Sequence, residues 1–183
     1  HCVHPMGCDR WQNGCGDCPS LESDFAVTHD TTALNWEIKR LAIQQSILDV
    51  IVASAWLEER VRASPIFENV RVHRIPFGID LERFRPTDSR KERANLNVEP
   101  GNVVLALRAT RSIFKGLDAV IGALERLETD QRITLLIFGE PGLLDRFSSR
   151  FQLIELGWIE DEEAMVRAYN AADIFLMPST AEG

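Results

Sequence analysis

Residues 103–139, VVLALRATRSIFKGLDAVIGALERLETDQRITLLIFG, decide the fold. Two short apolar runs, 103–107 and 133–138, flank a segment at 115–127 whose apolar residues recur at helical spacing. Short runs rich in Val, Ile and Leu are typical of buried strands. The periodic apolar residues of the segment between the two runs are typical of an amphipathic helix. A strand, a helix and a second strand joined by short loops form the unit of parallel sheets. The stretch therefore predicts a parallel sheet covered by helices.

The same alternation extends to both sides of this stretch. Downstream, the pattern predicts a helix at 141–150, a strand at 153–156, a helix at 161–171 and a strand at 173–177. Upstream, it predicts a helix at 31–45, a strand at 49–53 that is buried, a helix at 54–62 capped by Ser54, and a strand at 70–75. The charged segment 87–93 is expected to be a linker or a surface helix. We therefore predict an α/β protein with Rossmann-like parallel sheets.

Composition and charge exclude several classes of protein. The 183 residues carry a formal net charge of −8, and 45% of them are hydrophobic. This composition is that of an ordinary globular protein. The negative charge, without a Lys/Arg cluster, offers no electrostatic footprint for nucleic acid. No apolar run approaches the roughly 18–20 residues that cross a bilayer, so we expect no transmembrane segment.

The four cysteines all lie near the start of the sequence, at Cys2, Cys8, Cys15 and Cys18. Cys15 and Cys18 form a C-x-x-C turn between glycines, which lets two thiolates converge on one ion. Four thiolates can hold a tetrahedral Zn²⁺ that rigidifies a segment with little apolar material. Two disulfides, or thiols that only pack, are the alternatives. The cysteine-free remainder favours a reducing compartment, so we expect a structural zinc site over disulfides.

Basic residues follow the first strand of the downstream sheet. Ligands of such sheets bind beyond the carboxyl ends of the strands, where strand order reverses. Arg108, Arg111 and Lys115 come after the run 103–107, and glycines follow the other strands. The sequence has no G-x-G-x-x-G and no P-loop motif, so dinucleotide and P-loop functions lose support. The residues instead favour a ligand with phosphates bound by cations near the start of a helix.

A series of short motifs identifies a family. In order, they are P-F-G-I-D at 76–80, F-R-P at 84–86, Arg108 with Lys115-Gly116, I-F-G at 137–139, Y-N-A-A-D at 169–173, and P-S with E-G at 178–183. This ordered series resembles the retaining, nucleotide-sugar-dependent glycosyltransferases of the GT-B fold, group 1 (family 4). The cysteine-rich start is similar to a subset of these enzymes with a Cys loop in the acceptor-side domain.

The resemblance implies roles for particular residues. An Arg and a Lys hold the donor diphosphate in the family, and these positions fall on Arg108 and Lys115, beside Gly116. Arg111 is a rival for the Arg role because the separation is longer than usual. Glu182 matches the first Glu of the family's paired-glutamate motif near the donor sugar and is the catalytic candidate. Gly78, Gly139, Ile159 and Gly183 are expected to line the donor sugar and nucleoside.

The positions of these motifs along the chain also imply its domain organisation. Residues 1–85 are predicted to be the C-terminal part of the acceptor-side domain, and 86–183 most of the nucleotide-sugar-binding domain. Two such domains need roughly twice this length, so we expect the 183 residues to be part of a longer enzyme, truncated at both ends and inactive alone. Its Trp158 is expected to lie in the core, and His29 to be exposed or hydrogen-bonded.

The predicted activity is transfer of a sugar from a UDP-, GDP- or ADP-sugar to an acceptor with retention at the anomeric carbon, in glycan or polysaccharide biosynthesis. The acceptor would be a sugar, a polysaccharide or a lipid-linked glycan. No cofactor is expected for catalysis. The alternatives are a nucleotide-sugar 2-epimerase, a phosphorylase of the same fold, or a non-catalytic binding module stabilised by metal. We expect a cytoplasmic protein, peripheral to the inner membrane face if the acceptor is lipid-linked.

The cysteine hypothesis has a direct test. Elemental analysis of protein purified under reducing conditions is expected to find about one zinc per chain, because four thiolates saturate one tetrahedral ion. Cys15→Ser is expected to lower that content. Protein that holds neither zinc nor iron after such purification contradicts the hypothesis.

Overall fold

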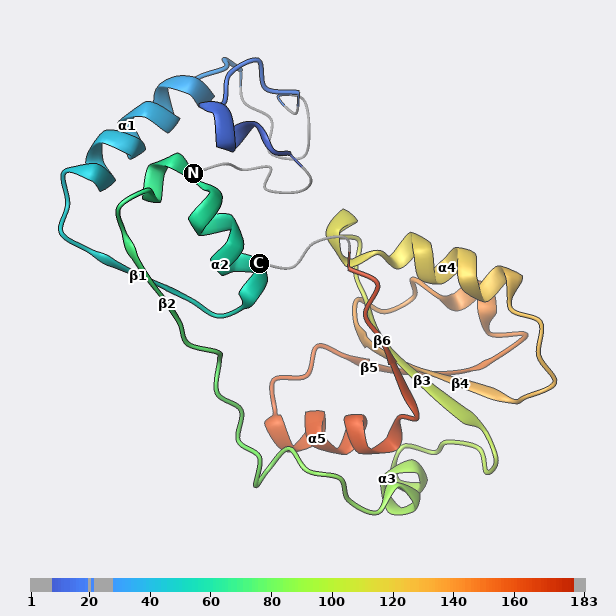
Figure 1. Ribbon diagram of the computed structural model, residues 1–183. Helices are drawn as coiled ribbons and strands as arrows, with labels where there is room; N and C mark the ends of the chain where they lie inside the picture. The colour runs from blue at the N-terminus through green and yellow to red at the C-terminus, as the bar shows by residue number, and fades with distance from the viewer. Residues whose placement is uncertain (1–7, 20, 22–27, 180–183) are drawn as a thin grey trace. The chain divides into compact units, whose positions relative to one another are not determined.

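The computed structural model describes residues 8–19, 21 and 28–179 (Figure 1). The chain divides into two compact units, one ending at Gly78 and the other beginning at Ile79. The boundary predicted from the sequence lies a short distance downstream, between residues 85 and 86. Each unit contains its own parallel sheet.

The second unit is built on a four-stranded parallel sheet with the order β5-β4-β3-β6. The strands are β3 (Val103–Ala109), β4 (Ile133–Gly139), β5 (Gln152–Gly157) and β6 (Ile174–Leu176). All three pairings are parallel. The predicted α/β class with Rossmann-like parallel sheets is confirmed.

Helices cover both faces of this sheet. Helix α4 (Leu117–Arg126) lies on one face, and α3 (Ser89–Asn95) and α5 (Glu162–Ala171) lie on the other (Figure 1). Alternate residues of the strands therefore enter two separate cores, one beneath α4 and one beneath α5. Strand β4 is buried along its whole length, as a central strand with both faces covered should be.

Two predicted helices of this unit differ from the structure. Lys115 lies in a 3₁₀ turn, η3 (Ile113–Lys115), and α4 begins only after Gly116. The helix predicted at 141–150 is wrong, because this segment contains only the short 3₁₀ turn η4 (Asp145–Phe147). Gly142 has a φ of 77°, and its N–H donates to the Glu155 carboxylate at 2.7 Å. That left-handed turn prevents a continuous helix.

The segment that enters the second unit is fixed by the end of α5. The Asn170 amide accepts from the N–H of Thr87 at 2.6 Å and donates to the carbonyl of Arg85 at 3.1 Å. Three residues later, the Asp173 carboxylate accepts from the N–H of Val104 at 2.8 Å and pairs with Arg93 at 2.6 Å. These contacts join α5, α3 and the first residues of β3. The motif Y-N-A-A-D thus has a structural role in this chain.

The first unit contains a two-stranded parallel sheet, β1 (Asp49–Val52) and β2 (Arg71–Arg74). Its helical elements are η1 (Arg10–Asn13), α1 (Thr32–Gln44), α2 (Ala55–Ala63) and η2 (Pro65–Phe67). The predicted cap is confirmed, since the Ser54 hydroxyl accepts from the N–H of Leu57 at 3.1 Å.

The apolar residues of the first unit are less buried than the sequence predicts. Val52 is buried, but Ile51 is 65% exposed, so the strand predicted at 49–53 is present but is not the buried strand expected. Burial alternates along β1 because successive side chains point to opposite faces of the sheet. Helix α1 also has exposed apolar residues, at Leu34, Ile38 and Leu41. Among the described residues, no helix has the length and apolar character needed to cross a bilayer.

The Asp173 contacts predict a pH-dependent contribution to stability. Burial raises the pKa of Asp173, but the hydrogen bonds from Val104 and Arg93 outweigh it and hold the pKa below its usual value. A lowered folded-state pKa stabilises the protein above the unfolded-state value of about 3.9, and this contribution is lost as the pH falls through the folded-state pKa. Asp173→Asn is expected to lower the free energy of unfolding at pH 7 by about 1 kcal/mol, given its partial exposure.

The measurement is urea denaturation of both proteins from pH 7 down to pH 3. The difference between them should shrink toward the acid end. Glu128→Gln, at an exposed position, is the control and should leave stability unchanged. A difference that stays constant across the whole pH range contradicts the role assigned to the Asp173 charge.

Candidate functional site

The strand order of the second unit places a crevice beside β3. The chain runs from β3 to β4 and β5 on one side and then crosses back to add β6 on the other side. Strand order therefore reverses between β3 and β6. In open parallel sheets, this reversal at the carboxyl ends of the strands is where ligands bind.

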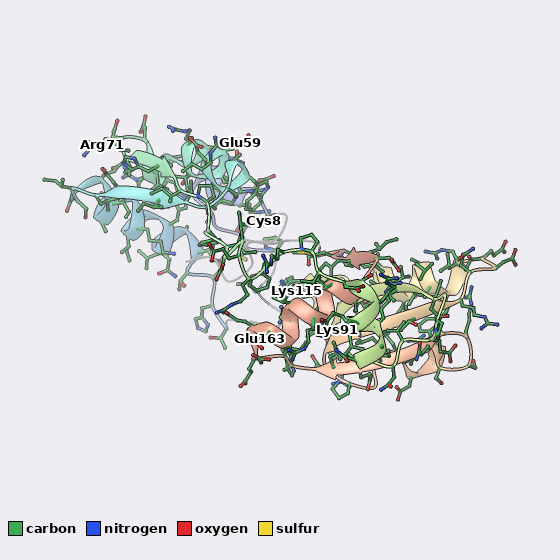
Figure 2. The ribbon with its side chains drawn as sticks, turned by 90° about the horizontal axis from the view of Figure 1, so that it is seen from below. Cys8, Glu59, Arg71, Lys91, Lys115 and Glu163 are labelled. Atoms are coloured by element: carbon green, nitrogen blue, oxygen red, sulfur yellow. The ribbon has the colours of Figure 1, made fainter. Side chains whose placement is uncertain are left out.

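A cavity of about 270 Å³ lies at this point of the sheet. It is lined by Arg108, Lys115, Tyr169, Phe175, Leu176, Met177, Pro178 and Ser179. The structure thus brings together Arg108, near the end of β3, and Lys115 (Figure 2), which lies on the following turn. Aromatic and apolar residues from α5 and β6 form the opposite wall. Two cations on one side of a small cavity suit an anionic ligand such as a diphosphate.

Gly116 allows the two loops that border the cavity to approach each other. Its φ is 67°, and a Cβ atom at this residue would lie 2.1 Å from the carbonyl oxygen of Pro178. The backbone entering α4 therefore packs directly on the backbone leaving β6. A side chain at this position would force the loops apart, because the opposing atom belongs to the main chain.

Gly139 has the same function at the end of β4. Its φ is 100°, and an added Cβ would lie 2.4 Å from the carbonyl oxygen of Ala109. That oxygen accepts a hydrogen bond from the N–H of Glu140 at 2.9 Å. The turns after β3 and β4 are therefore held together by backbone contact. Gly139 is needed here for close packing of the two backbones.

The Glu140 carboxylate organises the loop after β3. It accepts from the N–H of Arg111 at 3.0 Å and from the hydroxyl of Thr110 at 2.8 Å. Its second oxygen pairs with the Arg111 guanidinium at 2.9 Å. These hydrogen bonds, the backbone one first, hold the pKa of Glu140 below its usual value. Arg111 is thus directed at a carboxylate and does not line the cavity, which leaves Arg108 as the cavity's arginine.

Arg108 is held by an aromatic ring. Its Cζ lies 4.9 Å from the centroid of the Trp158 ring. Trp158 follows β5 and is 60% exposed, so the prediction that its ring lies in the core is wrong. The next residue, Ile159, instead packs against the core beneath α5. Residues that directly follow a strand at the carboxyl edge tend to be exposed, and that position was the available signal for Trp158.

The remaining predicted site residues are placed as follows. Gly78 ends the first unit, does not have a positive φ, and has no atom within 4 Å of an added Cβ. Ile159 contributes its side chain to the core, and its backbone follows Trp158. Glu182 and Gly183 lie outside the described residues. His29 is exposed, as predicted.

Tyr169 also lines the cavity, a position that the sequence analysis did not predict for it. It is 43% exposed and contacts the ring of Phe175 at 5.4 Å between centroids. Its place at the end of α5, where a helix packed on a sheet reaches the sheet's margin, explains the exposure.

The cysteine segment shows local order without a grouping of metal ligands. Cys8, Cys15 and Cys18 are half-buried. The Asp30 carboxylate accepts from the N–H of Cys18 at 2.8 Å and from Thr32, and these hydrogen bonds lower the pKa of Asp30. Within residues 8–19, 21 and 28–179, no three His, Cys, Asp or Glu side chains are grouped to hold a metal ion. Cys2 lies outside the described residues, and the zinc site stays a prediction.

Comparison with known proteins extends the geometric argument. No protein-family model matches the chain. A D-inositol 3-phosphate glycosyltransferase from Nocardia farcinica is 32% identical over 126 residues, which are 61% of this chain and 28% of that protein. The structure is similar to sucrose-phosphate synthase from Thermosynechococcus elongatus, with a TM-score of 0.62 and 22% identity over 93% of this chain and 42% of that one.

A second solved structure, Anabaena HepE in complex with UDP and glucose, matches with a TM-score of 0.55 and 21% identity. It covers 78% of this chain and 42% of that one. In sequence the chain is similar to glycosyltransferases, and its fold is that of solved GT-B glycosyltransferases. The predicted resemblance to this family is thereby confirmed. The chain matches less than half of the length of each of these GT-B relatives.

The close contact at Gly116 yields a prediction for this GT-B unit. Gly116→Ala is expected to lower the free energy of unfolding by about 1–3 kcal/mol, because the residue is left-handed and its Cβ would meet the backbone of Pro178. Thermal or urea unfolding followed by circular dichroism measures the effect.

Gly101→Ala is the matched control for Gly116→Ala. Gly101 also has a positive φ, 84°, but nothing lies within 4 Å of its added Cβ. It should therefore show only the smaller backbone cost. Equal destabilisation by the two variants contradicts the close-packing role of Gly116.

Proposed function

We propose that the second unit binds the diphosphate of a nucleotide-sugar donor, as part of a retaining glycosyltransferase. The observation that carries this proposal is the convergence of Arg108 and Lys115 on one cavity at the strand reversal. The cavity lies at the carboxyl ends of parallel strands, where this fold class binds ligands. The UDP and glucose named in the HepE complex, and the ADP named in a similar starch synthase structure, support the donor class.

The chemistry follows from the charges. In sugar transfer, the bond between the anomeric carbon and the diphosphate oxygen breaks, and the leaving group takes the electron pair. Negative charge therefore develops on the nucleoside diphosphate. The guanidinium of Arg108 and the ammonium of Lys115 would stabilise that charge as it forms, since preorganised cations act most strongly where charge develops. An acceptor hydroxyl then forms the new bond on the same face of the sugar, and its proton passes to the departing diphosphate.

Other residues complete the proposal. Glu182, after the cavity residues Pro178 and Ser179, is proposed to act beside the donor sugar, and Gly183 to border it. The acceptor is proposed to be a hydroxyl of a sugar, polysaccharide or lipid-linked glycan. We assign the diphosphate to side-chain cations, without a role for a metal cofactor in holding it. Arg111 is not included, because Glu140 already neutralises it.

Nucleotide binding by the 183-residue chain tests the proposal. Isothermal titration calorimetry with UDP, GDP and ADP is expected to show binding of at least one of them. Lys115→Met should weaken that binding by about tenfold or more, because a hydrogen bond to a charged group contributes about 1.5–3 kcal/mol. Lys91→Met is the matched control, since exposed Lys91 lies on α3 and does not line the cavity (Figure 2).

The two variants separate local from general electrostatics. Lys91→Met removes the same charge from the same unit and should leave the affinity unchanged. An affinity that Lys115→Met does not change, or that both variants change equally, contradicts the assigned role. With the parent enzyme, a product epimerised without any acceptor would identify an epimerase instead of a transferase.

A further inference from the structure

The two arginines after β3 differ in what holds them. Arg111 is paired with the Glu140 carboxylate, whose negative charge offsets that of the guanidinium. Arg108 forms no ion pair with a carboxylate of the described residues and instead lies against the indole of Trp158. An aromatic face attracts a guanidinium without neutralising it. Of the two, only Arg108 therefore keeps a full positive charge at the cavity.

The sheet geometry explains how these residues meet across β4. Arg108 of β3 is in register with Phe138 of β4, and Phe138 is in register with Gly157 of β5. Trp158 follows directly, after a left-handed turn at Gly157 with a φ of 64°. The Arg108 side chain must cross the end of β4 to reach it. There, β4 ends in Gly139, and Arg108 Cγ lies 3.8 Å from the position of an added Cβ.

Contact with an aromatic face leaves the arginine able to bind phosphate. A ring contacts the flat face of a guanidinium, whereas the N–H groups point outward in its plane. Those in-plane donors form the paired hydrogen bonds that phosphate oxygens accept. Stacking therefore limits the rotation of a long side chain and leaves its recognition edge open. An exposed arginine without this support would lose more conformational entropy on binding.

We propose that Trp158 is a positioning residue, whose indole face holds the Arg108 guanidinium across the end of β4 and keeps it ready for the donor diphosphate. The inference rests on the proposed donor-binding function. It assigns a role to an exposed tryptophan that acts through Arg108, independent of the identity of the nucleobase.

Calorimetric titration of the 183-residue chain with UDP and with inorganic pyrophosphate tests the inference, because pyrophosphate has no base on which Trp158 could stack. Trp158→Leu is expected to weaken the binding of both ligands by about two- to fivefold, which corresponds to the free energy of an exposed cation–π contact. Trp158→Phe retains an aromatic face and should restore most of the affinity. Adding Trp158→Leu to Arg108→Met should cause no further loss.

Trp56→Leu is the matched control, because Trp56 is also an exposed tryptophan stacked on an arginine, with Arg60 Cζ at 4.2 Å, but in the first unit. It should leave both affinities unchanged. Circular dichroism melting of each variant verifies that the fold is intact. If Trp158→Leu does not fold, Trp158→Phe decides: affinities close to those of the unmodified chain support the inference, and a loss that persists in the Arg108→Met background overturns it.

The outcomes separate the inference from the proposed function. If the unmodified chain binds neither nucleotides nor pyrophosphate, both the proposed function and the inference about Trp158 are contradicted. If Lys115→Met weakens binding and Trp158→Leu does not, only the inference about Trp158 is contradicted. A loss seen with UDP and not with pyrophosphate, or one that persists in Arg108→Met, overturns it in favour of direct contact between Trp158 and the base.

Discussion

The parallel pairing of β3 with β4 on one edge and β6 on the other is the constraint on which the second unit depends. The strand is central, so its backbone is satisfied on both sides and its side chains enter both cores. The same pairing creates the reversal of strand order at which the cavity lies. Asp173 reinforces it at the amino end of β3, through the N–H of Val104 and the side chain of Arg93.

The carboxyl edge of this sheet depends on close approach between backbones. At Gly116 and at Gly139, an added Cβ atom would lie too close to a main-chain carbonyl oxygen. The loops after three different strands are consequently packed against one another. Such packing gives the cavity walls a defined position before any ligand arrives, which is what preorganised charge stabilisation requires.

The cations at this edge differ in the side chains that contact them. A carboxylate on the turn after β4 pairs with Arg111, and an indole on the turn after β5 contacts Arg108. Lys115 lines the cavity from the turn before α4. The net charge of the chain is negative, yet the cavity has a cationic side because the local arrangement separates a neutralised arginine from one that retains its charge.

Local pattern was sufficient for most of the elements and for the family. Apolar periodicity predicted every strand of the second unit and two of its helices, because burial of alternate or of every third and fourth residue is a local property of sequence. It failed at 141–150, where the left-handed turn at Gly142 is accompanied by a hydrogen bond from the Gly142 N–H to the Glu155 carboxylate. It also failed for the exposed residues Ile51 and Trp158, since their burial depends on which elements cover them.

The sequence by itself determined the order of strands and helices, and the chemical identity of the residues after each strand. Only the tertiary structure decided which of two nearby arginines keeps its charge for the cavity. The partners that decide it, Glu140 and Trp158, lie on the turns after two other strands. Sheet register, a property of the folded chain, brings these turns together.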